Sequence, residues 1–295
     1  MKRITWLLKS IEYKFKVIRC AISSDRRYKE LKFQKDFGIL PDLNNPRRFN
    51  EKVICRMLYD NNDIFTLLAD KVNARKYIIE KIGHEYLVPL IGVYKSFDEI
   101  NFRKLPERFA IKCSHDSGSC IVCEDRLNFS VDDAKRKINF FLKRNMYYTT
   151  REKHYKKIPP VIICEEYIDV FRGRCRNVTP ELFRIHCFSG QAHYIEADFT
   201  DSHSGEYVNI YDIYWKRIHV TVGYPALPYE ILPPAKLEEI LRLSRVLAKD
   251  FDYCRLDWFI ANEKIYFSEY TFSPCAGRML FNPTSFDYIL GELWH

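Results

Sequence analysis

Glycine is scarce in this sequence, with 10 in 295 residues, and there are 13 prolines, four methionines and four tryptophans. So few glycines exclude a collagen-like or low-complexity chain. A membrane-spanning helix is not expected in the first 22 residues because basic side chains interrupt their apolar positions. No cleavable secretory signal is recognisable there either. A Walker phosphate loop is also missing, since no Gly-Lys pair closes a loop of the required spacing.

What remains is the composition of an ordinary globular protein, 47% hydrophobic and 29% charged. A formal net charge of +8 favours anionic partners such as nucleotides, acidic glycans or an anionic membrane surface. No zinc finger, basic zipper or RNA-binding signature is present, so nucleic acid is not expected as a partner.

The ten cysteines do not predict a disulfide framework, because the chain is long and several thiols lie in apolar runs. Reduced thiols in a cytoplasmic protein are the expectation. Cys120 and Cys123 have the spacing of a metal knuckle, but no second pair follows, so a structural zinc is the lesser interpretation.

Residues 1–22 interleave apolar side chains with Lys and Arg and predict a basic amphipathic helix. Such a helix can lie on an anionic membrane or pack on the protein's own surface, and the sequence leaves both interpretations open.

The rest of the chain alternates irregularly between helical and strand patterns, which predicts an α+β fold. A loop is expected over residues 38–50. Helices are expected over 66–81, from Ser130 and over 234–249. The expected strands cover 86–94, 109–113, 120–123 and 161–168, with hairpins at 182–188/192–197 and 253–260/264–270.

The first group of candidate functional residues is Lys112 with the loop 114–119, which contains Ser114, His115, Ser117 and Gly118. A lysine that ends a strand before a small polar loop can bind a triphosphate through its ammonium and the loop's backbone N–H groups. The alternative is an ordinary polar turn with a solvated lysine.

The second group is the strand end Glu165, Glu166, Tyr167 and Ile168. Its backbone can pair with an adenine edge while a carboxylate lies near the ribose. A strand that simply emerges into solvent explains the same pattern.

The third group is Arg255 and Asp257 on one strand and Glu269 on the next, each within apolar residues. A buried carboxylate is costly unless it is paired or binds a metal, and Mg²⁺ prefers oxygen ligands. Asp257 lies opposite Glu269 if the hairpin loop has three residues, 262–264, and we predict that odd-length loop. The alternative is a structural ion pair with Arg255.

These segments together resemble the TupA-like branch of the ATP-grasp family, which is associated with bacterial polysaccharide and teichuronopeptide biosynthesis. The resemblance runs from about residue 40 to the C-terminus. It rests on ten motifs in order: 49–52, Asp70-Lys71 with Arg75, 83–89, 96–100, 111–118, Glu165 with Tyr167, Tyr211-Asp212 with Trp215, 223–225, 255–257 and 269–274.

The resemblance implies an ATP-grasp fold, with ATP held between a small α+β lobe and a larger antiparallel-sheet lobe. With the basic amphipathic helix of the sequence pattern taken as domain 1–30, the expected domains are an N-terminal lobe 31–106, the small lobe 107–168 and the C-terminal lobe 169–295. Lys112 and the loop would bind the phosphates, and residues 165–168 the adenine. Asp257 and Glu269 would hold Mg²⁺, Arg255 would steady the transferred group, and Lys71 and Arg184 would contact phosphate or substrate.

The chemistry it implies is a carboxylate–amine ligase, with an acyl-phosphate intermediate and an amide product. The substrate would be a uronic acid or similar acid of a surface polysaccharide such as capsule or O-antigen. The basic N-terminal helix is consistent with a cytoplasmic protein that works peripherally at the inner membrane face. A glycosyl- or phosphoryl-transferase of the same pathway, or a non-catalytic ATP-binding subunit, are the alternatives. Asp116 and Cys120 stand where the family has Gly, so Asp116 could bring negative charge close to the phosphates.

Overall fold

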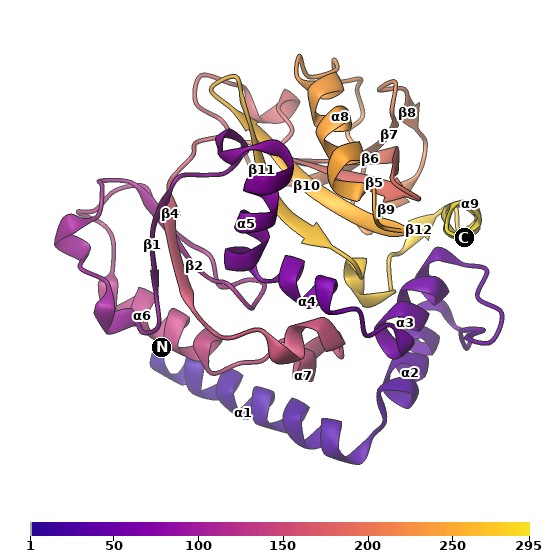
Figure 1. The fold of residues 1–295 in the computed structure, drawn as a ribbon, viewed down its shortest axis with the longest axis horizontal. Coiled ribbons are helices and arrows are strands. Elements are labelled where there is room, and N and C mark those ends of the chain that lie inside the picture. The colour runs from indigo at the N-terminus through magenta and orange to yellow at the C-terminus, as the bar shows by residue number, and fades with distance from the viewer. Residues whose placement is uncertain (1) are drawn as a thin grey trace. The chain divides into compact units, whose positions relative to one another are not determined.

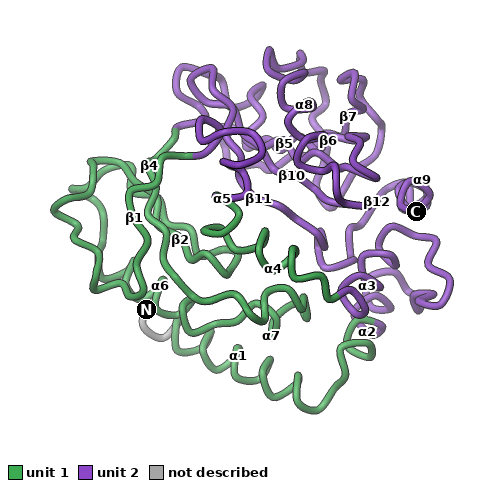
Figure 2. Tube along the Cα trace, viewed as in Figure 1, with its two compact units in different colours: residues 1–29, 61–75, 88–168 green, residues 30–60, 76–87, 169–295 purple. Residues whose placement is uncertain are grey.

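A computed structural model describes residues 2–295, with side chains from Thr5 onward. The chain forms two compact units (Figure 2). Unit 1 comprises the chain up to Lys29 with residues 61–75 and 88–168. Unit 2 comprises residues 30–60, 76–87 and 169–295. The chain therefore passes between the units several times. Helices α2 (Asp25–Phe37) and α5 (Lys71–Ile82) each begin in unit 1 and end in unit 2.

Unit 1 is built on a four-stranded antiparallel sheet in the order β1-β4-β2-β3. Figure 1 labels three of these strands, β1, β4 and β2. The strands of unit 1 are β1 (Leu90–Tyr94), β2 (Phe109–Cys113), β3 (Ile121–Cys123) and β4 (Ile162–Glu166), and its helices are α1 (Lys2–Ile22), α4 (Asp63–Ala69), α6 (Val131–Leu142) and α7 (Tyr147–Thr150). Side chains alternate between the two faces of a strand. Phe109, Ile111 and Cys164 pack with Ile138 of α6, while Lys112 and Glu165 lie on the other face.

Unit 2 contains a six-stranded antiparallel sheet in the order β11-β10-β5-β6-β7-β8 and a small β12-β9 pair. The strands are β5 (Leu182–Phe188), β6 (Gln191–Thr200), β7 (Glu206–Asp212), β8 (Arg217–Ile218), β9 (Thr221–Val222), β10 (Tyr253–Ala261), β11 (Lys264–Thr271) and β12 (Phe281–Asn282). The helices lying wholly in unit 2 are α3 (Phe49–Tyr59), α8 (Leu237–Ala248) and α9 (Ser285–Leu293).

Helix α8 covers the apolar face of the large sheet. The indole of Trp258 on β10 donates a hydrogen bond to Ser244 Oγ of α8 at 3.0 Å, and Tyr270 Oη of β11 donates to Leu247 O at 3.1 Å. Because the strands alternate, the residues between these apolar positions face away from α8. Among those residues are Arg255, Asp257 and Glu269.

One predicted helix differs in the structure. The helix expected over 66–81 is two helices, α4 and α5, separated at Asp70, whose backbone is extended. The Asp70 carboxylate accepts hydrogen bonds from Val72 N at 3.0 Å and from Asn73 Nδ2 at 2.7 Å. It therefore caps α5, and this capping outweighs the continuous apolar spacing across the two helices. The strand expected over 86–94 also begins only at Leu90, in β1.

The ten cysteines are all free thiols. Burial raises the pKa of Cys113 and of Cys164 to about 12, so both thiols stay protonated at neutral pH. Among the residues from 2 to 295, no helix is long and apolar enough to cross a membrane.

Candidate active site

In unit 1, the face of the sheet away from α6 carries a carboxylate between two cations. Lys112 lies opposite Ile163 on the neighbouring strand, and Glu165 lies two residues further along on the same face. Glu165 Oε2 is 2.5 Å from Lys112 Nζ, and Glu165 Oε1 accepts from Arg75 Nη1 at 2.9 Å. Glu165 is buried, whereas the Lys112 side chain is 23% exposed. One carboxylate thus holds two cations in place and leaves one positive charge in surplus.

The loop between β2 and β3 is anchored by a buried ion pair. The carboxylate of Asp116 contacts the Arg144 guanidinium with both oxygens, Oδ2 at 2.7 Å from Nε, and its side chain is fully buried. Arg144 also donates to Ser117 O at 3.0 Å. The negative charge that the sequence placed among phosphate-binding residues is therefore neutralised inside the unit. Its role is to fix the loop.

His115 lies at the same anchor. Its ring is 2% exposed, and Nε2 lies 3.2 Å from Phe141 O and 3.0 Å from Arg144 O, at the C-terminal end of α6. Burial lowers the pKa of His115, although Asp116 opposes this effect. Ser119 Oγ accepts from Cys113 N at 2.8 Å and closes the base of the loop. The exposed part of the loop is Ser117 and Gly118, where Gly118 has a φ of +85° that favours glycine.

Lys71 reaches the same loop from the start of α5. Its Nζ donates to Asp116 O at 3.0 Å, and its backbone N–H donates to Ser114 O at 3.2 Å. Ser114 is buried with Oγ 3.4 Å from Pro159 O. The structure therefore brings Lys71 to the loop, as the predicted site requires, and adds Arg75, which the sequence-based site omitted.

At the end of β4 the backbone leaves the sheet. Glu166 is exposed, and its N–H donates to Pro89 O at 3.0 Å. Tyr167 Oη donates to Glu124 Oε1 at 3.1 Å, and the Arg108 guanidinium lies 4.4 Å from the Tyr167 ring centre. Ile168 is the last residue of unit 1. The proposed adenine segment therefore combines one buried carboxylate with three more accessible residues.

In unit 2, charged side chains form a row across four adjacent strands. The pairing places Glu269 of β11 opposite Asp257 of β10, Asp257 opposite Arg184 of β5, and Arg184 opposite Glu196 of β6. Arg255 lies two residues before Asp257 and therefore on the same face. Side chains directly opposite each other in an antiparallel sheet interact, so the row is one electrostatic unit.

The predicted opposition of Asp257 and Glu269 is confirmed, but the predicted three-residue loop is wrong. Ala261 pairs with Lys264, so the turn has two residues, Asn262 and Glu263, with φ of 49° and 60°. Two left-handed residues form the tight turn that matches the twist of a hairpin. The pairing then shifts between Asp257 and Trp258, where Ser268 is an extra residue on β11. This β-bulge supplies the one-residue shift that we had assigned to the loop.

Asp257 and Arg255 form a bidentate pair. Arg255 Nε lies 2.8 Å from Asp257 Oδ1 and Nη2 lies 2.7 Å from Oδ2, and Nη2 also donates to Thr271 Oγ1 at 3.2 Å. Asp257 is 1% exposed. Burial raises the pKa of Asp257, and the Arg255 charge opposes the rise. The structure thus shows the ion pair that was the alternative interpretation, together with the carboxylate opposition that a metal site needs.

Two further carboxylates, Glu196 and Asp198, were not among the predicted site residues. Glu196 Oε1 is 2.6 Å from His186 Nε2, and Glu196 Oε2 accepts from Arg184 Nη1 at 3.3 Å. Burial raises the pKa of Glu196, but His186, Arg255 and Arg184 outweigh it and bring the pKa to about 2. Asp198 contacts Arg184, yet burial raises the pKa of Asp198 to about 7.

The charge of this face fits a divalent cation. Glu196, Asp198 and Asp257 stand against the guanidiniums of Arg184 and Arg255, so −3 and +2 leave −1 when all three are ionised, and Glu269 lies opposite Asp257 in the same row. One oxygen of Asp198, Oδ1, is buried without a hydrogen-bond partner, whereas Oδ2 contacts Arg184. A buried oxygen without a partner marks a place where an ion or a water molecule can bind. No three His, Cys, Asp or Glu residues in the described part of the chain form a metal-binding group. Mg²⁺ commonly binds one or two carboxylates with substrate phosphates and waters, and such a site needs no protein cage.

The sequence matches one protein family over most of its length. The TupA-like ATP-grasp family matches residues 51–295, which is most of the sequence and includes every group described above. The chain belongs to the TupA-like ATP-grasp family. The α+β ATP-grasp fold expected from the sequence is therefore confirmed. No curated protein matches the sequence.

Several solved structures are similar to this TupA-like chain. The D-alanine–D-alanine ligase of Bacillus anthracis complexed with ATP is 16% identical, over 70% of this chain and 54% of that one, with a TM-score of 0.37. The L-amino acid ligase of Bacillus licheniformis is 13% identical, over 71% and 42% of the two chains, with a TM-score of 0.41. This chain spans about half the length of these two proteins.

Proposed function

We propose that this protein is an ATP-dependent ligase that activates a carboxylate and joins it to an amine. The observation that carries the proposal is the opposition of Asp257 and Glu269 beside Arg255, on a charged sheet face within the matched family region. Asp257 and Glu269 would hold Mg²⁺, which neutralises phosphate charge when bound. Arg255 would then hold the transferred group, because a guanidinium binds phosphate oxygens in pairs.

Unit 1 would bind the nucleotide. Lys112 and Lys71 supply ammonium groups, and the exposed Ser117 and Gly118 supply loop N–H groups for the phosphates. The segment 165–168 would bind the adenine. Such chemistry needs positioning and charge neutralisation more than a protein nucleophile, which agrees with a site made of cations and carboxylates.

The burial of Asp116 weakens the support for the alternative function, a non-catalytic subunit that binds ATP without turning it over. That alternative drew its support from a negative charge in the phosphate loop. In the structure this charge is paired with Arg144 and fully buried, so it does not repel a nucleotide. The surface-polysaccharide setting and a uronic acid or similar acceptor remain proposals that rest on the family.

The test is ADP release from Mg-ATP by the wild type, Glu269→Gln and Asp257→Asn, with exposed Asp250→Asn as the matched control. Uronic acids, nucleotide-uronates and acidic oligosaccharides are each paired with amino acids. ADP release that needs both a carboxylate and an amine supports the ligase if Glu269→Gln and Asp257→Asn lose it and Asp250→Asn keeps it. Release with a sugar or hydroxyl acceptor and no amine contradicts it. An amide product identified by mass spectrometry distinguishes this ligase from a phosphoryl transferase.

A further inference from the structure

Helix α1 has two apolar faces, and only one of them packs on unit 1. Trp6, Tyr13 and Cys20 recur every seven residues and lie on the inner face. The Trp6 and Phe140 ring centres are 5.4 Å apart, Tyr13 Oη accepts from Asn145 N at 2.8 Å, and Cys20 Sγ lies 3.9 Å from Tyr148 O. Figure 2 shows α1 running beside α6 and α7 of the same unit. The inner face therefore attaches the helix along its length.

The outer face carries a second apolar stripe. Its residues are spaced three or four apart, which aligns them on one side of a helix. Their side chains are between 42% and 80% exposed: Leu8, Ile11, Phe15, Ile18 and Ile22. Leu7, next to them, is 62% exposed. A contiguous apolar stripe on the outside of a protein marks an interaction surface.

Helix α1 is basic as a whole. By sequence, residues 2–22 contain six Lys or Arg and one acid, Glu12, so six minus one gives +5. Lys14 is exposed, whereas Lys9 lies over the Trp6 ring and Arg19 over the Tyr28 ring. Glu12 is neutralised by Lys16 at 2.7 Å. A second copy of this helix would bring a further +5 to the same surface, and like charges oppose that pairing. An anionic surface complements both the stripe and its flanks.

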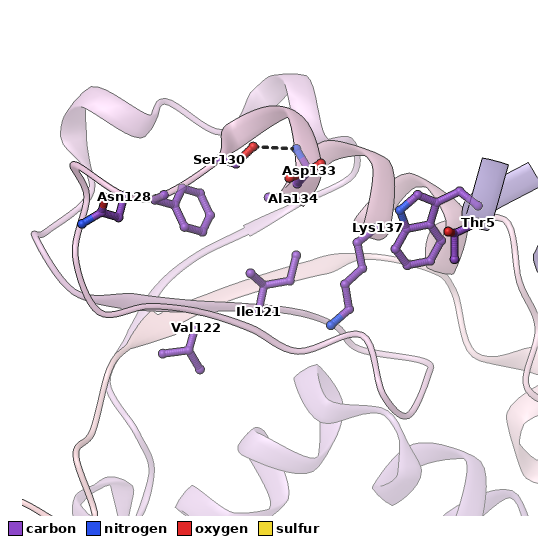
Figure 3. A pocket seen from close by; sticks show the side chains of 10 residues that line it. Thr5, Ile121, Val122, Asn128, Ser130, Asp133, Ala134 and Lys137 are labelled. Carbon is purple, nitrogen blue, oxygen red and sulfur yellow. Dashed lines mark hydrogen bonds between the residues drawn. The ribbon is translucent and has the colours of Figure 1, made fainter. Parts of the chain in front are cut away.

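Two apolar hollows flank Trp6. One, of about 480 Å³, lies between α1 and α6 and is lined by Trp6, Leu7 and Phe140, with Lys135, Arg136 and Lys143 among its charged residues. The other, of about 420 Å³, lies toward β3, and Figure 3 shows Ile121, Val122 and Lys137 around it. Lys135 and Arg136 are paired with Asp98 and Asp133, and Lys143 and Asp132 also line the larger hollow. Apolar space next to a lysine such as Lys143 suits a phospholipid, with an acyl chain inside and its phosphate on the ammonium.

We propose that the outer face of α1 docks this protein on an anionic lipid surface, with the helix lying in the plane of the headgroups. The apolar stripe enters the acyl boundary, and the flanking Lys and Arg contact lipid phosphates. The inner face keeps unit 1 attached during docking. This inference rests on α1 and on the two hollows beside Trp6, and it does not depend on the proposed ligase activity.

The experiment is sedimentation of the full chain with phosphatidylcholine vesicles that contain or lack phosphatidylglycerol. The stripe variant is Phe15→Ser with Ile18→Ser, and the matched control is Leu127→Ser with Leu232→Ser, which are 94% and 88% exposed elsewhere. We expect the wild type and the control to bind only the anionic vesicles. The stripe variant should bind at least about tenfold more weakly, because two large side chains no longer enter the apolar layer.

A charge variant separates the electrostatic contribution. Lys9→Glu with Lys14→Glu should lose most binding, and raising the salt concentration should reproduce the loss in the wild type. Lys104→Glu, an exposed lysine outside α1, should bind almost as the wild type does. Unchanged thermal midpoints show that each variant is folded.

Three outcomes overturn the proposal. The wild type could fail to bind anionic vesicles, or the stripe variant could bind as well as the control. Light scattering could also show a wild-type dimer that the stripe variant dissociates, without vesicle binding by either. The stripe would then be an interface between copies of this chain.

Discussion

The two units use charge in opposite ways. In unit 1, Lys112 and Arg75 stand against one carboxylate, Glu165, while Asp116 is paired with Arg144; two minus one leaves +1. In unit 2, Glu196, Asp198 and Asp257 stand against Arg184 and Arg255, and three minus two leaves −1 when all three carboxylates are ionised. The first face suits phosphate and the second suits a cation. The comparison teaches that the net charge of +8 describes neither site.

The strongest way to break this comparison is to remove Asp257. Asp257→Ala leaves the Arg255 guanidinium buried without its partner. We expect the free energy of unfolding to fall by about 3–5 kcal/mol and ATP turnover to be lost. Urea denaturation measures the loss, with exposed Asp250→Ala changing stability by less than about 0.5 kcal/mol. Replacing both partners, as Arg255→Met with Asp257→Leu, should recover most of the stability but none of the turnover. A double variant that still turns over ATP contradicts the metal assignment.

The next largest effect concerns the loop anchor. Arg144→Gln leaves the buried Asp116 carboxylate unpaired, and we expect a cost of about 3 kcal/mol and weaker ATP binding, because the loop loses its support. Adding Asp116→Asn should restore much of the stability. Calorimetry of unfolding and of ATP binding measures both quantities. If Arg144→Gln binds ATP as the wild type does, the loop does not contact the nucleotide.

Lys112→Met tests whether the cations of unit 1 bind the phosphates of ATP. Removing one ammonium from a phosphate site should weaken ATP binding at least about tenfold, or about 1.4 kcal/mol. Lys104→Met is the control for loss of an exposed lysine. Titration calorimetry with ATP measures the change, and equal affinities for Lys112→Met and the control would remove Lys112 from the proposed site.

The smallest effect is a pH dependence from Asp198. Its pKa is raised from 3.8 to about 7, first by burial and then by the charges of Glu196 and Asp257 against Arg184. A raised carboxyl pKa stabilises the folded state at low pH, and this contribution is lost as the pH rises from about 4 to 7. Asp198→Asn should remove that slope. Thermal midpoints of the wild type and of Asp198→Asn are measured between pH 4 and 8, and the difference between them should change with pH. A difference that is the same at every pH contradicts the assignment.

The sequence predicted the helices and strands better than the register between paired strands. The apolar runs predicted both hairpins of unit 2 because burial sets their pattern. The register could not be predicted where a β-bulge adds one residue to a strand. The turn Ser189-Gly190 alone would pair Arg184 with Ile195, but the pairing shifts between His186 and Cys187 and brings Glu196 opposite Arg184. A bulge has no clear sequence signal, yet it moves every later side chain to the other face.

The anchoring of the loop was hidden for a different reason. Asp116 and Arg144 are 28 residues apart, and only the packing of α6 against the sheet brings them together. Sequence alone showed a negative charge among small polar residues and suggested interference with phosphates. A clue was available in Arg144, a basic residue just past the end of the predicted helix that begins at Ser130. The same limit hid Arg75, whose contact with Glu165 depends on the placement of α5.

Helix α6 has a consequence for how unit 1 moves. Near its C-terminal end, Phe140 contacts Trp6 of α1, and the last turn and the residue Arg144 beyond it hold His115 and Asp116 of the loop. The two contacts lie within about one turn of each other, at one end of a helix that ends at Leu142. Residues held by the same end of a helix move with it, so we expect a displacement of α1 at Trp6 to displace the residues that anchor the loop. The exposed Ser117 and Gly118 are thereby mechanically coupled to the N-terminal helix.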